Sequence, residues 1–279
     1  MGSHLPASAV EPGFALRDIW LKYQVDFHRR VKTLRELVVT RTKGVLRGRG
    51  DFAREDREFW ALKGVTLSAG RGEALGITGS NGAGKSTLLQ VVARIMQPDR
   101  GTVSVTGVVG SLLSFGAGFN LGLSGRENVH INGALLGLSR AQLDARMDDI
   151  IELSGIGEFF DASVRTYSSG MRARLGFAIA ANINPDVLLI DEVVQVGDAF
   201  FQMKAGNILD RFRDQKKVIV LVTHSPDMIL RYCTRAIWME HGEIWRDGPV
   251  GEVVQEYMKW SQRRVQEEQE HLSAGPVGA

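Results

Sequence analysis

The chain is poor in cysteine and in long apolar runs, and each shortage excludes a class of protein. Its 279 residues include one cysteine, Cys233, so no disulfide can form within the chain, and no basic start followed by an apolar stretch marks a secretion signal. We therefore expect a reducing compartment, the cytoplasm. The run Val218 to Val222 is five residues long and no longer apolar run occurs, far below the roughly 20 residues of a membrane-spanning helix.

The net charge is also small. The 34 Lys and Arg residues are nearly balanced by 32 Asp and Glu residues, which leaves a formal charge of +2. Such a balance gives no argument for nucleic acid as a partner. The length and the 44% apolar content are typical of a globular protein with one large or two modest domains and a sizeable core.

One segment, residues 25–58, departs from this balance because it is rich in Arg and Lys. Within it Phe27, Val31, Leu34 and Val38 recur at helical spacing. The pattern predicts a basic amphipathic helix. Two interpretations stay open, a solvated surface insertion and a segment that docks on a membrane surface or a partner.

The apolar patterns of the remaining chain predict an α/β fold. The runs FWALKGVTL, EALGIT and GTVSVTGVV indicate a small sheet that is partly antiparallel. The continuous runs VLLI and VIVLVT are typical of strands buried on both faces of a parallel core sheet. Between these two groups the sequence has several helical patterns, and a hairpin turning at His241 and Gly242 follows the last run.

These patterns divide the chain into five predicted parts. They are an N-terminal segment with possible tag residues and the first strand (1–24), the basic amphipathic insertion (25–58), an α/β core (59–119 and 184–249), a helical subdomain (120–183), and a C-terminal helix and tail (250–279).

A glycine-rich loop carries the strongest chemical signal. The stretch GSNGAGKS, Gly79 to Ser86, fits the pattern G-x-x-x-x-G-K-[ST], with a strand before it and a helix after it. Glycines let backbone N–H groups approach phosphate oxygens, and the helix N-terminus adds favourable partial charge. Lys85 would reach the β and γ phosphates of ATP and Ser86 would ligate Mg²⁺. The predicted phosphate-binding residues are Gly79, Ser80, Asn81, Gly82, Ala83, Gly84, Lys85, Ser86 and Thr87.

Acidic residues and a histidine end the two buried strands that follow. Asp191 is expected to hold Mg²⁺ together with Ser86, and Glu192 to polarise a water for attack on the γ-phosphate. His224 is expected to hydrogen-bond the γ-phosphate, since ligands bind at the carboxyl ends of parallel strands. A lone histidine is more often structural than catalytic. The predicted catalytic set is Glu192, His224 and Lys85.

The order of these motifs resembles the nucleotide-binding subunits of ATP-binding-cassette (ABC) proteins, from about Val25 to Gly248. The stretch YSSGM stands where that family has its signature LSGGQ. The resemblance implies a P-loop NTPase core with an antiparallel β-subdomain and an inserted helical subdomain. It also implies a head-to-tail dimer, in which the signature binds the γ-phosphate of ATP held by the opposite subunit. The signature residues are Tyr167, Ser168, Ser169, Gly170 and Met171.

The resemblance implies three further assignments. Asp198, in the stretch QVGD, falls where the family has an aspartate that acts on the opposite subunit's site. Trp60 falls where the family places an aromatic ring that stacks on adenine, with Phe59 as the neighbouring candidate and a core aromatic as the alternative. Ser114 or Phe115 stands where the family usually has a glutamine in the loop before the helical subdomain. Because neither residue is a glutamine, the resemblance does not assign water positioning or Mg²⁺ sensing to that loop.

Local features are similar to the subfamily that exports O-antigen, capsule and teichoic acid, namely GAGFNLGLSGRENV with YSSGM. This similarity implies an ATPase at the cytoplasmic face of the inner membrane. It would drive a lipid-linked polysaccharide through a separate transmembrane permease. Some members have a C-terminal carbohydrate-binding domain; with 31 residues after Gly248, we expect the permease to choose the substrate. The alternatives are an exporter of lipid or drugs, a soluble ABC ATPase and a regulator without turnover.

Overall fold

The computed structural model describes residues 12–25, 57–112, 119–135, 138–191 and 199–273. Several predictions lie outside the described residues. These are the predictions on the basic segment between 26 and 56, on the loop residues Ser114 and Phe115, on Glu192 and on Asp198.

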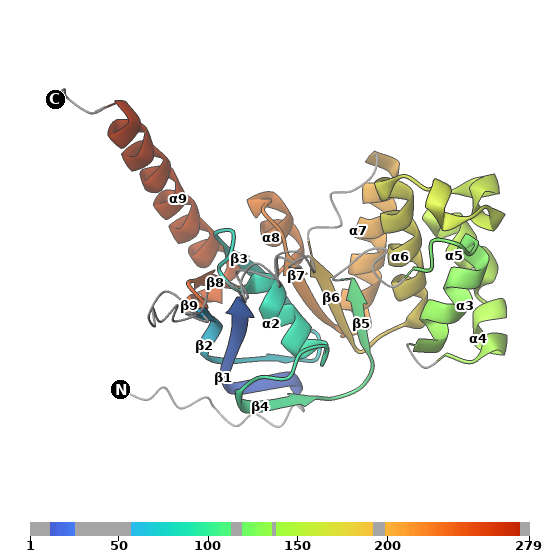
Figure 1. Cartoon of the computed structure of the whole chain (residues 1–279), viewed down its shortest axis with the longest axis horizontal. Coiled ribbons are helices and arrows are strands. Elements are labelled where there is room, and N and C mark those ends of the chain that lie inside the picture. Colours follow the sequence, from blue (N-terminus) through green and yellow to red (C-terminus); the bar gives the residue numbers. More distant parts are fainter. Residues whose placement is uncertain (1–11, 26–56, 113–118, 136–137, 192–198, 274–279) are drawn as a thin grey trace, which may run out of the picture.

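A six-stranded sheet forms the centre of the molecule, with strand order β5-β6-β7-β3-β8-β9 (Figure 1). Its strands are β3 (Ala74–Gly79), β5 (Val109–Leu112), β6 (Val187–Asp191), β7 (Val218–Val222), β8 (Arg235–Glu240) and β9 (Glu243–Pro249). Neighbours from β5 to β8 are parallel, while β9 returns antiparallel. The predicted hairpin turn is confirmed, with positive φ angles of 51° at His241 and 84° at Gly242.

A second sheet is antiparallel and has the order β2-β1-β4. Its strands are β1 (Pro12–Val25), β2 (Arg57–Gly70) and β4 (Arg100–Val105). The prediction that the three early β runs form one small sheet is wrong. Strand β3 lies inside the parallel sheet, between β7 and β8. The run GTVSVTGVV divides at Gly107, whose φ of 87° turns the chain from β4 in one sheet to β5 in the other.

Helices cover the large sheet and build a separate helical region beside β5 (Figure 1). The sheet is accompanied by α2 (Lys85–Val92), α7 (Ala199–Asp214), α8 (Pro226–Tyr232) and α9 (Val250–Ser273), while the helical region contains α3 (Gly125–Leu135), α4 (Arg140–Asp144), α5 (Met147–Ser154) and α6 (Ser169–Ile183). Helix α2 ends at Val92, and the positive φ of 58° at Arg94 turns the chain away from the helix.

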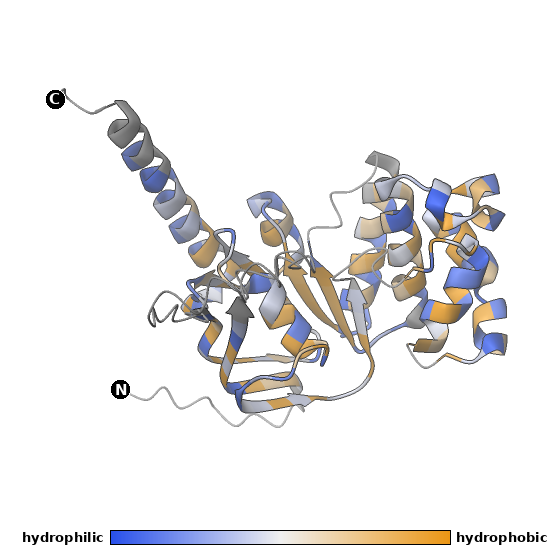
Figure 2. Cartoon of the chain, viewed as in Figure 1, coloured by the Kyte–Doolittle hydropathy of each residue, from blue (hydrophilic) through white to orange (hydrophobic). Residues whose placement is uncertain are grey.

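Helix α6 joins two hydrophobic cores. Phe177 packs with the sheet-side cluster, which includes Ile190 of β6, while Leu175 and Ile179 pack with the cluster of the helical region. Figure 2 shows the strongly apolar central strands and the mainly polar outer part of α9. Because α6 is buried on both sides, the signature residues at its start are held firmly relative to the sheet. Within the described ranges, each helix is too short or too polar to cross a bilayer.

Candidate functional site

The phosphate loop connects β3 to α2 at the carboxyl edge of the parallel sheet. Gly79, Gly82 and Gly84 have φ angles of 143°, 80° and 101°. A Cβ atom at Gly84 would lie 2.6 Å from the carbonyl oxygen of Ala61, so this position requires glycine both for its backbone angle and for space. The loop leads directly into the N-terminus of α2, where the first N–H groups have no partner within the helix. The result is a backbone site for anions.

Lys85 places its ammonium group inside this loop. Its side chain is buried, and Nζ donates to the carbonyl oxygens of Gly79, at 2.7 Å, and Ser80, at 2.8 Å. The long side chain therefore folds back over the start of the loop. Phosphate oxygens entering the loop would compete with these carbonyls for the cation, since a charged acceptor makes a stronger hydrogen bond than a neutral one.

Ser86 and Asp191 form the pair predicted to hold a metal ion. Asp191 ends β6, and its Oδ2 accepts a hydrogen bond of 2.9 Å from the Ser86 hydroxyl. A hydroxyl and a carboxylate are oxygen ligands of the kind that suits Mg²⁺, so the pair fits this ion. The described part of the chain contains no cluster of three or more His, Cys, Asp or Glu side chains arranged to hold a metal. An ion here would complete its shell with phosphate oxygens and water.

His224 lies at the same edge of the sheet. It follows β7 by two residues, and β7 lies between β6 and β3, which carry Asp191 and the phosphate loop. The side chain is exposed and lines a pocket of about 480 Å³ whose other wall is α9, including Tyr257 and Met258. The sheet thus brings together the carboxyl ends of β3, β6 and β7, which lead to the phosphate loop, Asp191 and His224. The contact of His224 with phosphate stays a prediction.

The signature presents a helix N-terminus to the surface. Ser168 is the N-cap of α6, and its Oγ accepts a hydrogen bond of 3.1 Å from the Met171 N–H. Ser168 and Ser169 are exposed and Gly170 is half-buried. The cap satisfies one donor of the first turn and leaves the neighbouring N–H groups for an external acceptor.

Tyr167 and Met171, the ends of the signature, pack inward instead. The Tyr167 ring is buried, and its hydroxyl donates to the carbonyl oxygens of Phe159, at 2.7 Å, and Phe160, at 3.2 Å. Burial raises the pKa of this hydroxyl above its ordinary value. Met171 packs against the helical core. These two side chains therefore anchor the signature, and Ser168, Ser169 and Gly170 form its surface. ATP binding by Tyr167 and Met171 stays a prediction.

The structure also places Trp60, the aromatic ring predicted to stack on adenine, whose contact with adenine stays a prediction. Trp60 pairs with Lys22 across the strands, and its ring packs edge-on against Trp20 with centroids 5.5 Å apart. Tyr23 is the neighbour of Lys22 and so points to the opposite face of the sheet. There its hydroxyl lies 3.4 Å from Thr87 Oγ1, on the phosphate-loop helix.

The face of Tyr23 is therefore the one that meets the nucleotide loop, and Phe59, its cross-strand partner, shares that face. Sequence reasoning missed Tyr23. Leu21 and Tyr23 alternate with Lys22 along β1, and this spacing, which puts Tyr23 on the face opposite Lys22, was the signal that would have found it.

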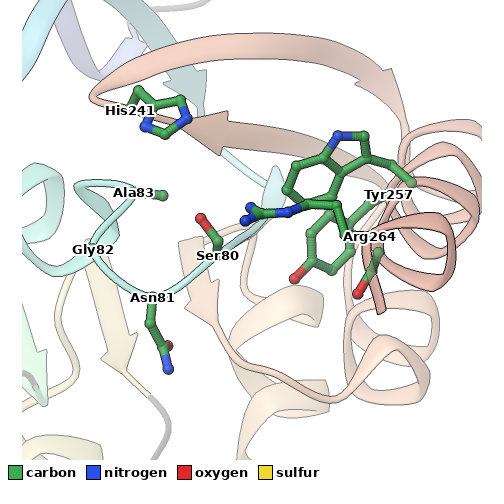
Figure 3. A pocket seen from close by; sticks show the side chains of 9 residues that line it. Ser80, Asn81, Gly82, Ala83, His241, Tyr257 and Arg264 are labelled. Carbon is green, nitrogen blue, oxygen red and sulfur yellow. The ribbon is translucent and has the colours of Figure 1, made fainter. Parts of the chain in front are cut away.

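A pocket of about 650 Å³ lies on the outer side of the phosphate loop. Figure 3 shows it between the loop, with Ser80 and Gly82, and helix α9, with Tyr257 and Arg264. His241, in the turn between β8 and β9, closes one end. Sequence reasoning did not connect α9 with the phosphate loop, because more than 160 residues separate them along the chain.

Comparison with known sequences identifies one family. The model of the ABC transporter family matches residues 62–195. The O-antigen export system ATP-binding protein RfbB of Klebsiella pneumoniae is 42% identical over 201 residues, which cover 72% of this chain and 82% of that protein. RfbB of Myxococcus xanthus is 46% identical over 212 residues, 76% of this chain and 48% of that protein.

The teichoic acids export ATP-binding protein TagH of Enterococcus faecalis is 44% identical over 205 residues, 74% of this chain and 46% of that protein. The chain thus spans about half the length of this relative and of the M. xanthus protein.

Solved structures share the fold. The dimeric post-hydrolysis state of the ATP-binding cassette MJ0796, bound to ADP and Pi, superposes with a TM-score of 0.66 at 21% identity and covers 85% of this chain and 98% of that one. The ATP-binding subunit of an ABC transporter superposes with a TM-score of 0.67 at 18% identity, covering 88% and 92%. The predicted α/β class, with an antiparallel sheet and an inserted helical region, is confirmed.

Proposed function

Because this chain belongs to the ABC transporter family of ATP-binding proteins, we propose that it is the ATP-hydrolysing subunit of a transporter that exports a lipid-linked polysaccharide. The observation that carries the proposal is the phosphate loop with buried Lys85 and the pair Ser86 and Asp191 beside it. This site occurs in a chain 42% to 46% identical to proteins named for O-antigen and teichoic acid export.

The residues of the loop would bind and orient the ATP phosphates. Lys85 would exchange the carbonyls of Gly79 and Ser80 for the β and γ phosphates, while Ser86 and Asp191 would hold Mg²⁺. The bound ion would neutralise charge on the phosphates. Phosphoryl transfer depends mostly on positioning and charge stabilisation, so the rigid edge of the sheet suits this task. Glu192 and His224 are proposed to position the attacking water.

Tyr23 and Phe59 are proposed to hold the adenine ring, in place of Trp60. The Tyr23 hydroxyl is next to Thr87, and Phe59 pairs with Tyr23 across the strands. An adenine ring that extends from phosphates bound at the start of α2 would meet these two rings first. Aromatic side chains stack on bases with little regard to which base is present.

A second copy is proposed to complete the site. Ser168 and Ser169 are exposed at the N-terminus of α6, beside half-buried Gly170, and such a terminus favours anions. In a head-to-tail dimer these residues, with Asp198, would face the ATP on the other copy. Closure of the dimer would assemble the catalytic site and thereby gate it.

The membrane part of the transporter is proposed to be a separate permease subunit. The chain would bind it at the cytoplasmic face of the inner membrane, and the permease would contact the lipid-linked polysaccharide. No role in nucleic-acid binding is proposed, since the formal charge of +2 gives no argument for one.

Gene deletion in the source organism tests this function. We expect loss of the polysaccharide from the cell surface and accumulation of the lipid-linked form inside, measured by antibody labelling of intact and opened cells. Wild-type chain restores export, the Lys85→Ala variant does not, and Arg246→Ala, which breaks an exposed ion pair with Glu256, restores it fully. Unchanged surface polysaccharide with altered lipid or drug export would replace this proposal with the alternative exporter.

A further inference from the structure

Glu240 is a buried carboxylate with no role in the site as described so far. It is the last residue of β8 and is 0% exposed. A carboxylate removed from water is stable only where hydrogen bonds or charges replace its hydration. Its partners therefore show what it does in the fold.

Three donors meet this carboxylate, and two of them belong to the phosphate loop. Oε1 accepts from the Ser80 backbone N–H at 2.9 Å and from the Trp238 indole N–H at 3.0 Å, while Oε2 accepts a short hydrogen bond from the Ser80 hydroxyl. Both oxygens thus hold the same residue, Ser80, once by its main chain and once by its side chain. This double contact fixes both the position and the rotamer of Ser80.

Ser80 connects Glu240 to Lys85. The carbonyl oxygen of Ser80 accepts from Lys85 Nζ at 2.8 Å. The peptide between Gly79 and Ser80 is also confined by β8, since a Cβ atom at Gly79 would collide with the carbonyl oxygen of Met239. The start of the loop is consequently held on one side by β8 and on the other by the catalytic lysine.

We propose that Glu240 is a positioning residue for ATP binding, which holds Ser80 so that the loop keeps the shape in which Lys85 and the loop amides meet the phosphates. The inference rests on the proposed ATPase function and adds a residue to that site. Glu240 does not touch the nucleotide. It accepts the Ser80 N–H that would otherwise be unpaired in a part-buried position, and so leaves the later amides of the loop for phosphate.

The same carboxylate connects the loop to α9. Trp238, which donates to Glu240, packs against Tyr257 and Trp260 with ring centroids 5.7 Å and 5.1 Å apart. Burial and the negative charge of Glu240 raise the pKa of the Tyr257 hydroxyl. Tyr257 and Trp260, both on α9, line the pocket in Figure 3 together with Ser80, so α9 covers the side of the loop where the carboxylate lies.

The experiment compares two carboxylates at opposite ends of the neighbouring parallel strands β3 and β8: Glu240 ends β8, and Glu73 directly precedes β3. Glu240→Leu removes the acceptors of Ser80 and keeps a similar volume. Its control is Glu73→Leu, because Glu73 also accepts from a backbone N–H, that of Gly70, and from a side chain, Arg235. For Glu240→Leu we expect the Kd for MgATP, measured by equilibrium binding, to rise about tenfold. For Glu73→Leu we expect an unchanged Kd despite a comparable fall in melting temperature.

Two further variants separate positioning from general stability. Glu240→Gln retains a carbonyl oxygen for the Ser80 N–H, so we expect it to recover most of the lost affinity. Ser80→Ala removes the hydroxyl bond alone, and we expect a rise in Kd of about threefold in the wild-type chain but no further rise in Glu240→Leu, since the two residues act as one unit. Ser80→Ala also serves if Glu240→Leu does not fold.

The outcomes distinguish the role of Glu240 from the proposed ATPase function. If the wild-type chain and Glu73→Leu bind MgATP and folded Glu240→Leu binds it equally well, the role of Glu240 is refuted and the ATPase proposal stands. If Ser80→Ala lowers affinity by the same factor with and without Glu240, the proposed coupling is refuted. If the wild-type chain binds no MgATP, both proposals fail.

Discussion

The phosphate loop and the signature loop are both helix N-termini suited to phosphate, yet they differ in how much of the site each provides. The phosphate loop has its own cation, Lys85, which donates to the loop carbonyl of Gly79, and its own oxygen pair, Ser86 and Asp191, which are hydrogen-bonded to each other. The signature has no charged side chain at its tip and offers Ser168, Ser169 and Gly170 to the surface.

The difference teaches how the chemistry is divided. Binding of nucleotide requires a concentrated positive charge and a metal site, and one chain supplies both. Contact with the γ-phosphate from a second copy would suit neutral hydrogen-bond donors, because a charged side chain there would lose its hydration when the two copies close. In the proposed dimer, a site divided in this way would bind ATP in one copy and become competent for hydrolysis only when the second copy arrives.

The largest expected effect comes from the phosphate loop. Lys85→Ala removes the ammonium group, and we expect phosphate release from ATP to fall by at least about 100-fold, because a preorganised charge at the phosphates is lost. Colorimetric phosphate release measures it. Lys204→Ala, which removes an exposed bond to the carbonyl of Glu152, should leave the rate unchanged. Near-normal hydrolysis by Lys85→Ala would contradict the view that the phosphate loop supplies the positive charge of the site.

Disrupting the signature tests whether the two loops act across copies. Ser168→Arg removes the cap of α6 and fills the space before the helix, so we expect hydrolysis to be abolished while ATP binding to the same chain persists. Mixing Ser168→Arg with Lys85→Ala should restore activity, because one site of the mixed dimer then has an intact loop and an intact signature.

The matched control for this variant is Ser139→Arg, which removes the cap of α4 in the same helical region. It should lose similar helix stability, about 1 kcal/mol, and keep hydrolysis. A mixture no more active than its two components would show that each copy works alone.

A smaller effect is expected from the rings beside the phosphate loop that are proposed to hold adenine. Tyr23→Ala should weaken ATP binding about tenfold, because stacking on a base contributes about 1–3 kcal/mol, whereas Trp60→Ala should change it little. Binding of inorganic triphosphate should be equal in both variants, since it has no base. Weaker ATP binding by Trp60→Ala alone would restore the assignment made from the sequence.

The smallest effect concerns the anchor of the signature. Tyr167→Phe removes the hydroxyl that donates to Phe159 and Phe160, and we expect the free energy of unfolding to fall by about 1 kcal/mol. Denaturant unfolding measures it. The Kd for ATP should not change, because the phosphate loop and α2 pack in a different hydrophobic cluster from Tyr167. A shift in Kd without a loss of stability would place Tyr167 in the binding site.

Much of the fold and of the site was predictable because both depend on local chemistry. The phosphate loop follows from glycines and a lysine at fixed spacing, and the buried strands β6 and β7 follow from continuous apolar runs. The partition of the early strands was not predictable in this way. Whether β3 joins β2 or β7 depends on pairing partners distant in sequence, and the pattern of a single strand does not specify its neighbour.

By itself, the sequence determined the kind of chemistry: a glycine loop with Lys85 and Ser86, an acid at a strand end and a serine cap before α6 are short motifs whose function is contained in neighbouring residues. Only the tertiary structure decided which ring meets the nucleotide loop, that Tyr167 and Met171 pack inward, and that Glu240 holds Ser80. These relations join residues up to 160 positions apart. They depend on which face of a strand or helix meets which neighbour, and that is settled by packing rather than by local pattern.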